Sequence, residues 1–301
     1  MEKIYFKDLA KVKSIAACIG FFDGMHLGHQ ALVKKTIEEA KLRNIKSALI
    51  TFDPDPNEVL KKEKGHHLSS LNIRERLVAM MGIDYFIILP FSLEIASYSP
   101  TKFINEFLLP LDIKALICGF DFRFGQAGKG NSDTLKEIMT CDIYVINEVM
   151  KDGYKISTTL IKEKLIEGKI EEANELLGYK YFIVGKVIKG KGNGHLLSFP
   201  TANVALDEDL PLKEGVYMGI TEVNNISYPS MINYGHNPTF NGNKYSFEVH
   251  LVNYDGSLYG KEIKVYLDTY LRNEIKFNSI EELKEQLIKD EDCVKRKYRI
   301  I

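Results

Sequence analysis

Short apolar runs alternate with amphipathic segments through the first half of the chain. Residues 14–22 form an apolar run closed by Gly and Asp, as a buried strand is, and 31–44 carries apolar residues at helical spacing. Such alternation is typical of an α/β fold, a mostly parallel sheet with helices on both faces that binds ligands at the carboxyl ends of its strands. The pattern predicts further strands at 47–52, 85–89, 114–118 and 142–149, and further helices at 73–81, 100–108, 132–139, 157–165 and 170–177.

Beyond about residue 179 the pattern changes to strands separated by turn residues. Only 279–289 has helical periodicity, with Ser279 and Glu282 forming a capping box. We therefore expect a small antiparallel β-barrel with one C-terminal helix, and two domains, 1–180 and 181–301. Asp255-Gly256 predicts a hairpin between the last two strands. The expected strands are 181–188, 201–206, 216–223, 228–232, 245–253 and 262–271.

The composition of the 301 residues is that of an ordinary globular protein, and the net charge of −1 offers no basic field for nucleic acid. No apolar run approaches the roughly 18 residues of a membrane helix, and the N-terminus has charges where a signal peptide has its apolar core. The cysteines are scattered without metal-ligand spacing, which favours reduced thiols. We expect a cytoplasmic protein whose partners are small molecules, with no nucleic acid and no membrane; a weak homo-oligomer is left open.

The segment 18–29 carries the strongest chemical signal. It places three glycines and two histidines, His26 and His29, between an apolar run and a helical pattern. Glycines let the backbone approach a ligand, and the N–H groups at a helix start point at an anion. Two histidines at such a place are often structural groups and no more. The flanking glycines after a strand favour a nucleotide phosphate site, with neutral imidazoles as hydrogen-bond donors.

Several motifs, taken together and in order, resemble the bifunctional bacterial riboflavin kinase/FAD synthetase family. HxGH alone marks nucleotidylyltransferases in general, whereas its combination with the later motifs is specific. The resemblance covers nearly the whole chain and implies a Rossmann-like FMN adenylyltransferase (FAD synthetase) domain followed by a β-barrel riboflavin kinase domain. The motifs are GFFDGMHLGH at 20–29, GFDFRFG at 119–125, ISTTLIK at 156–162, FPTAN at 199–203, GVY at 215–217, NYG at 233–235, EVHL at 248–251, LYG at 258–260 and LRNEIKF at 271–277.

For the first half the resemblance implies transfer of AMP from ATP to FMN, giving FAD and pyrophosphate. His26 and His29 are the expected catalytic residues, which stabilise charge on the α-phosphate without covalent chemistry. Helix capping by the hydroxyls at 157–159 and a buried Asp121–Arg123 pair are the structural alternatives. Contacts to nucleotide or flavin are expected from Gly20, Phe22, Asp23, Gly24, Gly28, Asp121, Arg123, Ser157, Thr158, Thr159 and Lys162.

For the second half it implies transfer of the γ-phosphate of ATP to riboflavin, giving FMN. Glu248 is the expected base, because strand alternation places it opposite the core side chains, although a surface glutamate is more common. Thr201 and Asn203 offer hard oxygens for Mg²⁺, with a turn and a sheet edge as the alternative. ATP or flavin contacts are expected from Gly190, Gly194, Pro200 and Arg272, the last with a surface ion pair as its alternative.

Some positions depart from the family's usual pattern: Lys162, His195 and Asn237 where arginine is usual, Ser198 where glycine is, Thr158 where serine is, and Asp55 where histidine is. One alternative is therefore a chain in which only one domain is active. Another is a flavin-binding regulator without catalysis, against which the intact HxGH and Glu248 speak. The segment 63–67, with two histidines, is interpreted as a solvated loop rather than a metal site.

Overall fold

The chain folds into two compact units, Met1–Thr158 and Thr159–Ile301. The computed structural model describes residues 1–61, 66–189, 199–206, 208–239 and 242–300. The division falls at the start of helix α7 (Thr158–Ile166), because the next helix, α8 (Ile170–Leu177), packs on the second unit. The functional limits 1–180 and 181–301 expected from the sequence stay a prediction.

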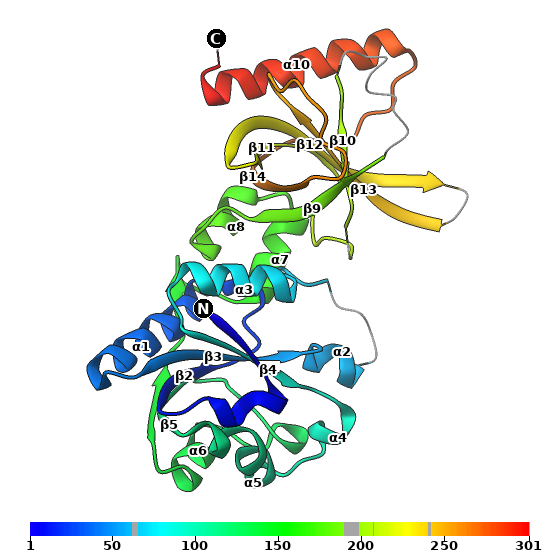
Figure 1. The fold of residues 1–301 in the computed structure, drawn as a ribbon. Helices are drawn as coiled ribbons and strands as arrows, with labels where there is room; N and C mark the ends of the chain where they lie inside the picture. The colour runs from blue at the N-terminus through cyan, green and yellow to red at the C-terminus, as the bar shows by residue number, and fades with distance from the viewer. Residues whose placement is uncertain (62–65, 190–198, 207, 240–241, 301) are drawn as a thin grey trace. The chain divides into compact units, whose positions relative to one another are not determined.

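The first unit is built on a fully parallel sheet of six strands in the order β1-β4-β3-β2-β5-β6. In Figure 1, α1 (Leu27–Arg43) and α3 (Leu71–Met80) lie on one face of this sheet, and α5 (Pro100–Phe103) and α6 (Ser132–Ile138) lie on the other. This cover on both faces explains the continuous apolar runs of the central strands. The predicted α/β architecture is confirmed. The strands are β1 (Glu2–Tyr5), β2 (Ile15–Ile19), β3 (Lys46–Asp53), β4 (Tyr85–Pro90), β5 (Ile113–Gly119) and β6 (Asp142–Ile146).

The helices of this unit follow the predicted order, with two short additions, α2 and α4, that the pattern did not predict. The stretch expected as one helix at 100–108 is α5 followed by a π-helical turn at Ile104–Leu108. The helices are α1 (Leu27–Arg43), α2 (Pro56–Lys61), α3 (Leu71–Met80), α4 (Leu93–Ala96), α5 (Pro100–Phe103) and α6 (Ser132–Ile138), and a small ribbon of β7 (Met150–Lys151) and β8 (Tyr154–Lys155) precedes α7.

The strand order reverses between β2 and β5. From β2 the chain continues to β3 on one side, whereas β5 lies against the other side of β2 and continues to β6. In open α/β sheets, ligands bind at this switch point, beyond the carboxyl ends of the two strands. The segments 20–29 and 119–125 follow β2 and β5 directly, so the topology brings both predicted motifs to one place.

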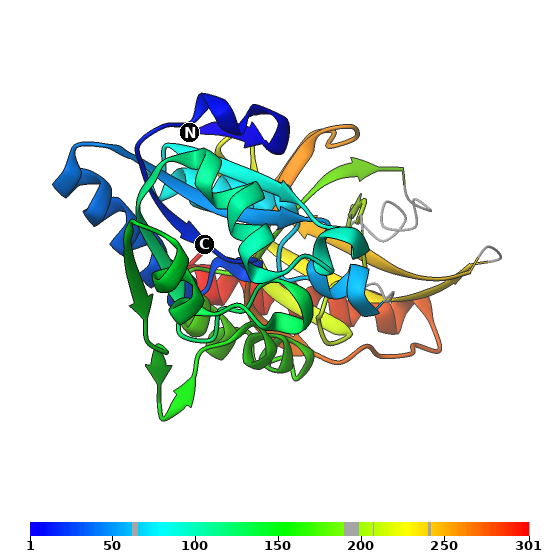
Figure 2. The same cartoon turned by 90° about the horizontal axis from the view of Figure 1, so that it is seen from below.

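The second unit contains a closed antiparallel barrel in the order β10-β13-β12-β11-β14-β9, with helix α10 (Ile280–Tyr298) beside it in Figure 1. The barrel interior is filled by alternate side chains of each strand, among them Tyr217, Phe247 and Val265, all of which are buried. Figure 2 shows β12 and β13 (yellow) running outward as a paired ribbon. The strands are β9 (Phe182–Ile188), β10 (Ala202–Val204), β11 (Gly215–Val223), β12 (Ile226–Thr239), β13 (Gly242–Leu251) and β14 (Glu262–Arg272).

The predicted hairpin at Asp255-Gly256 is wrong. The segment joins β13 to β14, but β13 pairs with β10 and β12, and β14 pairs with β11 and β9. A turn signal marks a change of direction and does not identify the strand that becomes the neighbour. The predicted barrel and C-terminal helix are confirmed, and the helix extends to Tyr298, beyond the expected 279–289.

We expect Gly219→Ala to destabilise the barrel, because a Cβ at this position of β11 would lie 2.0 Å from the carbonyl oxygen of Tyr266 on β14. The two strands must spread to admit it, at a cost of about 1–3 kcal/mol. Amide hydrogen exchange is the measurement: protection should fall in β11 and β14 and stay at the wild-type level in β2 and β3. Unchanged protection in β11 and β14 would contradict the close approach.

Candidate functional site

The segment 20–29, here called the cradle, leaves the end of β2 through left-handed backbone. Phe22, Gly24 and Met25 have φ angles of 61°, 73° and 39°. Gly24 is required, because an added Cβ would meet the Cδ1 atom of Leu68 at 2.6 Å in addition to the cost of positive φ. Its N–H donates a 2.7 Å hydrogen bond to the Oγ atom of Ser69. The glycine therefore lets the cradle pack closely on the segment before α3.

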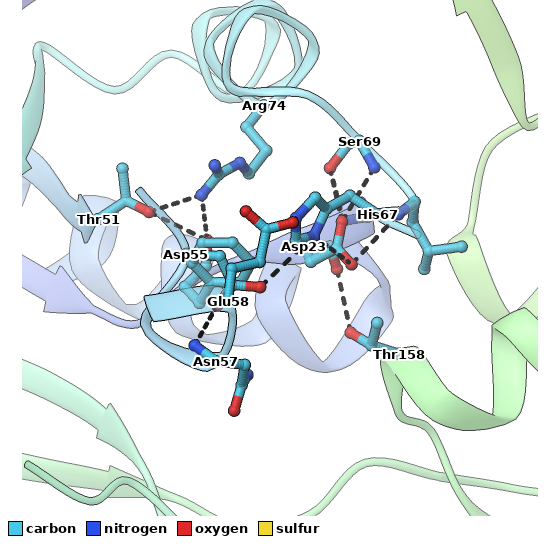
Figure 3. Close-up of polar contacts among 12 residues, drawn as sticks. Asp23, Thr51, Asp55, Asn57, Glu58, His67, Ser69, Arg74 and Thr158 are labelled. Atoms are coloured by element: carbon cyan, nitrogen blue, oxygen red, sulfur yellow. Dashed lines mark hydrogen bonds and ion pairs between the residues drawn. The ribbon is translucent and has the colours of Figure 1, made fainter. Parts of the chain in front are cut away.

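Asp23 holds the cradle to that same segment. Its buried carboxylate accepts hydrogen bonds from the main-chain N–H groups of Leu68 (3.2 Å) and Ser69 (2.9 Å) and from the hydroxyl of Ser69 (Figure 3). The hydroxyl of Thr158 donates to the Asp23 carbonyl oxygen at 3.2 Å. Both residues are thus parts of the scaffold here, and their predicted contact with a ligand stays a prediction.

Helix α1 begins at the cradle with His26 as its N-cap. The Nδ1 atom of His26 accepts the N–H of His29 at 3.4 Å, so the proton of the neutral His26 ring is on Nε2. The two rings stack with centroids 3.7 Å apart, and the buried ring of Phe22 meets His29 edge-on. An added Cβ at Gly28 would lie 3.1 Å from the His26 ring, so Gly28 leaves room for the stack. The two histidines therefore lie together at the start of α1.

Burial keeps both imidazoles neutral. It lowers the pKa of His26 to about 4, against the opposing effect of the carboxylates of Asp23 and Asp121. It lowers the pKa of His29 well below the ordinary value, and the positive charge of Arg74 adds to this. The Nδ1 atom of His29 is buried and has no hydrogen-bond partner among the residues that the structure describes. The pair therefore offers polar ring atoms to a ligand at neutral pH without positive charge.

Arg74 of α3 is a site residue that the sequence pattern did not single out. Its buried guanidinium donates to the carbonyl oxygen of Phe21 at 2.7 Å and to the hydroxyl of Thr51 at 3.0 Å, and it lies 4.3 Å over the Phe21 ring (Figure 3). It thus ties the cradle to the end of β3. In the sequence Arg74 resembles any charged residue of an amphipathic helix, so only its burial distinguishes it.

The interpretation of 63–67 as a solvated loop is wrong for His67, whose side chain is only 13% exposed. Its Nε2 atom lies 3.0 Å from Glu58, and its Nδ1 atom lies 3.6 Å from Asp55 and 3.9 Å from Asp23 (Figure 3). Burial raises the pKa of Asp55. Among the described residues, no group of three or more His, Cys, Asp or Glu side chains could hold a metal ion. The positions 63–65 lie outside the described residues.

Some of the other residues predicted for the first site lie in the first unit, and the rest lie in the second. Asp121 is exposed and pairs with Lys155 at 2.6 Å, and Arg123 is exposed as well, so the alternative of a buried Asp121–Arg123 pair is wrong. The N–H of Gly20 donates to the Ile50 carbonyl at 3.1 Å, at the end of the sheet. Ser157 is half-buried in the first unit. Thr159 and Lys162 belong to the second unit, and their contact with phosphate stays a prediction.

In the second unit, strand register places three polar side chains in a row. Glu248 of β13 pairs across the sheet with Asn203 of β10 on one side and Asn233 of β12 on the other. Residues paired in this way point to the same face of a sheet, so the carboxylate stands between two amides. The hydroxyl of Thr201 lies 3.3 Å from the Glu248 carboxylate. Because β10 is paired on both sides, the alternative of a sheet edge is wrong.

Thr201, Asn233 and Glu248 line a cavity of about 500 Å³ within the second unit. Arg272 lines it and forms hydrogen bonds of 2.6–3.1 Å with the buried carboxylate of Asp290 on α10, so its ion pair is not at the surface. Glu248 also lines the cavity and is half-buried. The predicted residues Gly190 and Gly194, with His195 and Ser198, lie outside the described residues. The apolar lining comes from Phe199, Val216, Met231, Ile232, Ile275, Phe277, Leu283 and Leu287.

Two family models match the chain in the order of its two units. The model for FAD synthetase matches residues 9–160, and the model for riboflavin kinase matches residues 177–298. A bifunctional riboflavin kinase/FMN adenylyltransferase from Listeria monocytogenes is 34% identical over 94% of this chain and 91% of its own length. The chain belongs to the bifunctional riboflavin kinase/FMN adenylyltransferase family.

A second relative and a solved structure show the same full-length correspondence. The protein of this name from Buchnera aphidicola is 38% identical over 98% of this chain and 97% of its own length. A solved structure named macrolide-efflux protein from Streptococcus pneumoniae has a TM-score of 0.88 and 29% identity, and the match covers 98% of this chain and 99% of that one. In the described part of this chain, no helix has both the length and the apolar character to cross a membrane.

Acid should destabilise the first unit through His26. The unfolded chain binds a proton at this imidazole near pH 6.5 and the folded chain only near pH 4, so the free energy of unfolding decreases as the pH falls between these values. The contribution of His26 amounts to about 3 kcal/mol when fully lost. Urea unfolding followed through the NMR signals of β2 should show a flatter pH dependence in His26→Gln than in the wild type. Equal slopes would contradict a neutral buried His26.

Proposed function

We propose that this chain makes FAD from riboflavin in two ATP-dependent steps, with one step in each unit. Two different family models match the chain, and each match falls almost entirely within one of the two compact units. This match is the main support for the proposal. The residues at each site support it further, because they suit different chemistry. The first site has a helix start and neutral imidazoles, and the second has a half-buried carboxylate beside hydroxyl and amide groups.

In the second unit, the 5′-hydroxyl of riboflavin attacks the γ-phosphorus of ATP, the bond to the β-phosphate oxygen breaks, and FMN and ADP form. Glu248 accepts the proton of the attacking hydroxyl. The Thr201 hydroxyl, 3.3 Å away, supports the carboxylate in this position, and Asn203 and Asn233 flank it on the neighbouring strands.

The residues beside Glu248 fit Mg²⁺. Thr201 and Asn203 would hold the ion with their side-chain oxygens, which are hard donors of the kind it prefers, and solvent would complete its shell. When bound, Mg²⁺ supplies positive charge against the phosphates of ATP. Pro200 and the segment that contains Gly190 and Gly194 precede these residues in the chain, and the proposal assigns them to ATP binding.

The cavity beside Glu248 suits the flavin ring system. Its lining is mainly apolar, and the rings of Phe199 and Phe277 are the aromatic side chains among the described lining residues. The chain has no tryptophan, so stacking on the isoalloxazine falls to such residues. Arg272, fixed by Asp290, lies at the same cavity and is the candidate for a contact with flavin or phosphate.

In the first unit, a phosphate oxygen of FMN attacks the α-phosphorus of ATP, pyrophosphate leaves, and FAD forms. His26 and His29 donate hydrogen bonds to the α-phosphate and to the leaving group, where negative charge develops. The main-chain N–H groups at the start of α1 act on the same anions. No side chain has to act as a nucleophile, because the unit holds two anionic substrates in line.

We place this enzyme in the cytoplasm, with small molecules as its partners and with neither nucleic acid nor a membrane. The near-zero net charge and the four unpaired cysteines support this placement.

Replacing Glu248 with glutamine should lower the rate of FMN formation from riboflavin and Mg-ATP by about 100- to 10,000-fold, since the general base is lost while the shape of the side chain is kept. Formation of FAD from supplied FMN should not change. Both products can be followed by chromatography of the flavins. If Glu248→Gln stopped FAD formation from FMN, the assignment of the steps to the units would be wrong.

His29→Ala should have the opposite selectivity. Removal of one hydrogen-bond donor at the developing charge should slow FAD formation from FMN by about 100- to 1,000-fold and leave FMN formation unchanged. His66→Ala, which alters an exposed histidine outside the cradle, is the matched control and should retain both activities. Flavin binding by the wild type without any turnover of ATP would support a regulator instead, and one absent activity would support a chain with one active unit.

A further inference from the structure

Pro200 and Thr201 lie just outside the strand ladder that holds their neighbours. Strand β10 begins at Ala202, which pairs with Val249, and a proline has no N–H to add to a ladder. Even so, the Thr201 hydroxyl lies 3.3 Å from the Glu248 carboxylate. A contact other than strand pairing must therefore set the position of the main chain at Pro200.

His250 provides such a contact. Its Nδ1 atom lies 2.9 Å from the carbonyl oxygen of Pro200. Because a carbonyl only accepts, Nδ1 is the donor, in the neutral ring as in the charged one. His250 follows Glu248 by two positions on β13, so both side chains belong to the same face, and both line the cavity. The imidazole is only 7% exposed, so water cannot readily replace it as the donor.

The other sides of the imidazole are also held. The ring of Phe199 packs against it with centroids 5.4 Å apart. Its buried Nε2 atom faces the Glu291 carboxylate of α10 at 3.6 Å, which is too long for a hydrogen bond, and Glu291 also pairs with Lys295 at 2.8 Å. His250 thus connects β13, the segment before β10 and helix α10.

We propose that His250 is a positioning residue of the phosphoryl-transfer site. Its Nδ1–H fixes the Pro200 carbonyl, and this contact places the Thr201 hydroxyl against Glu248. The inference rests on the proposed kinase function. His250 acts through Thr201, so its loss should affect the use of Mg-ATP rather than the binding of riboflavin.

Three replacements separate the hydrogen bond from simple packing. In His250→Asn the side-chain amide stands near the position of Nδ1 and keeps the donor. In His250→Gln the amide reaches toward the position of Nε2, and in His250→Phe the ring is kept without a donor. The measurements are kcat for FMN formation, the Mg²⁺ concentration at half-maximal rate, and riboflavin affinity from quenching of flavin fluorescence without ATP.

We expect His250→Gln and His250→Phe to lower kcat by about 10- to 100-fold and to raise the half-saturating Mg²⁺ concentration, as loss of an outer-shell partner does. His250→Asn should restore both quantities to near the wild-type values. Riboflavin affinity and FAD formation from supplied FMN should stay unchanged in all three. His236→Phe on β12, where the ring packs on Tyr245, is the matched control and should behave as the wild type.

The inference is overturned if the kcat of His250→Asn falls as far as that of His250→Phe. It is also overturned if the variants lose riboflavin affinity while their Mg²⁺ dependence stays that of the wild type. Should His250→Phe fail to fold, which loss of the circular-dichroism spectrum of the wild type would reveal, the comparison of His250→Asn with His250→Gln decides alone. A wild-type chain that forms no FMN would overturn the proposed function and this inference with it. If the wild type forms FMN and the Asn and Phe variants are equally impaired in this reaction, only the inference about His250 is overturned.

Discussion

The register of β13 against β10 and β12 is the constraint on which the second site depends. Side chains alternate along a strand, so a slip of one residue would turn Glu248 into the barrel and expose Phe247. The buried interior residues on the same strand resist that slip, because exposing them would cost apolar burial. The hydrophobic core of the barrel thereby fixes the orientation of a carboxylate on the opposite face of the strand.

Under the proposed function, the two sites would handle phosphate charge by different physical means. In the first unit, burial keeps His26 and His29 neutral, and the ends of β2, β3 and α3 are tied together by Asp23 and Arg74. Hydrogen-bond donors and main-chain dipoles would then act on the proposed substrates. In the second unit, a carboxylate stands beside a hydroxyl and two amides, and the proposal brings a cation there with the nucleotide.

Much of this arrangement is predictable from the sequence, for identifiable reasons. Apolar runs and the glycine-rich cradle predict the parallel sheet and the place of His26 and His29, because periodicity and glycine are local signals. The structural roles of Arg74 and His67 are not predictable from the sequence, because they come from burial against distant segments. The place of Asn233 beside Glu248 is not predictable either, because it depends on strand register. The wrong hairpin at Asp255-Gly256 has the same cause, since the sequence does not identify which strands pair.

Two sites on one chain are proposed to act on two different phosphorus atoms of ATP. Isotope tracing distinguishes these atoms, with riboflavin as the only flavin supplied and ATP labelled at either the γ- or the α-phosphorus. FMN should carry the γ-label and not the α-label, and FAD should carry the γ-label on its riboflavin side and the α-label in its AMP half. FMN that carries the α-label, or FAD without the γ-label, would show that the two steps are not divided in this way.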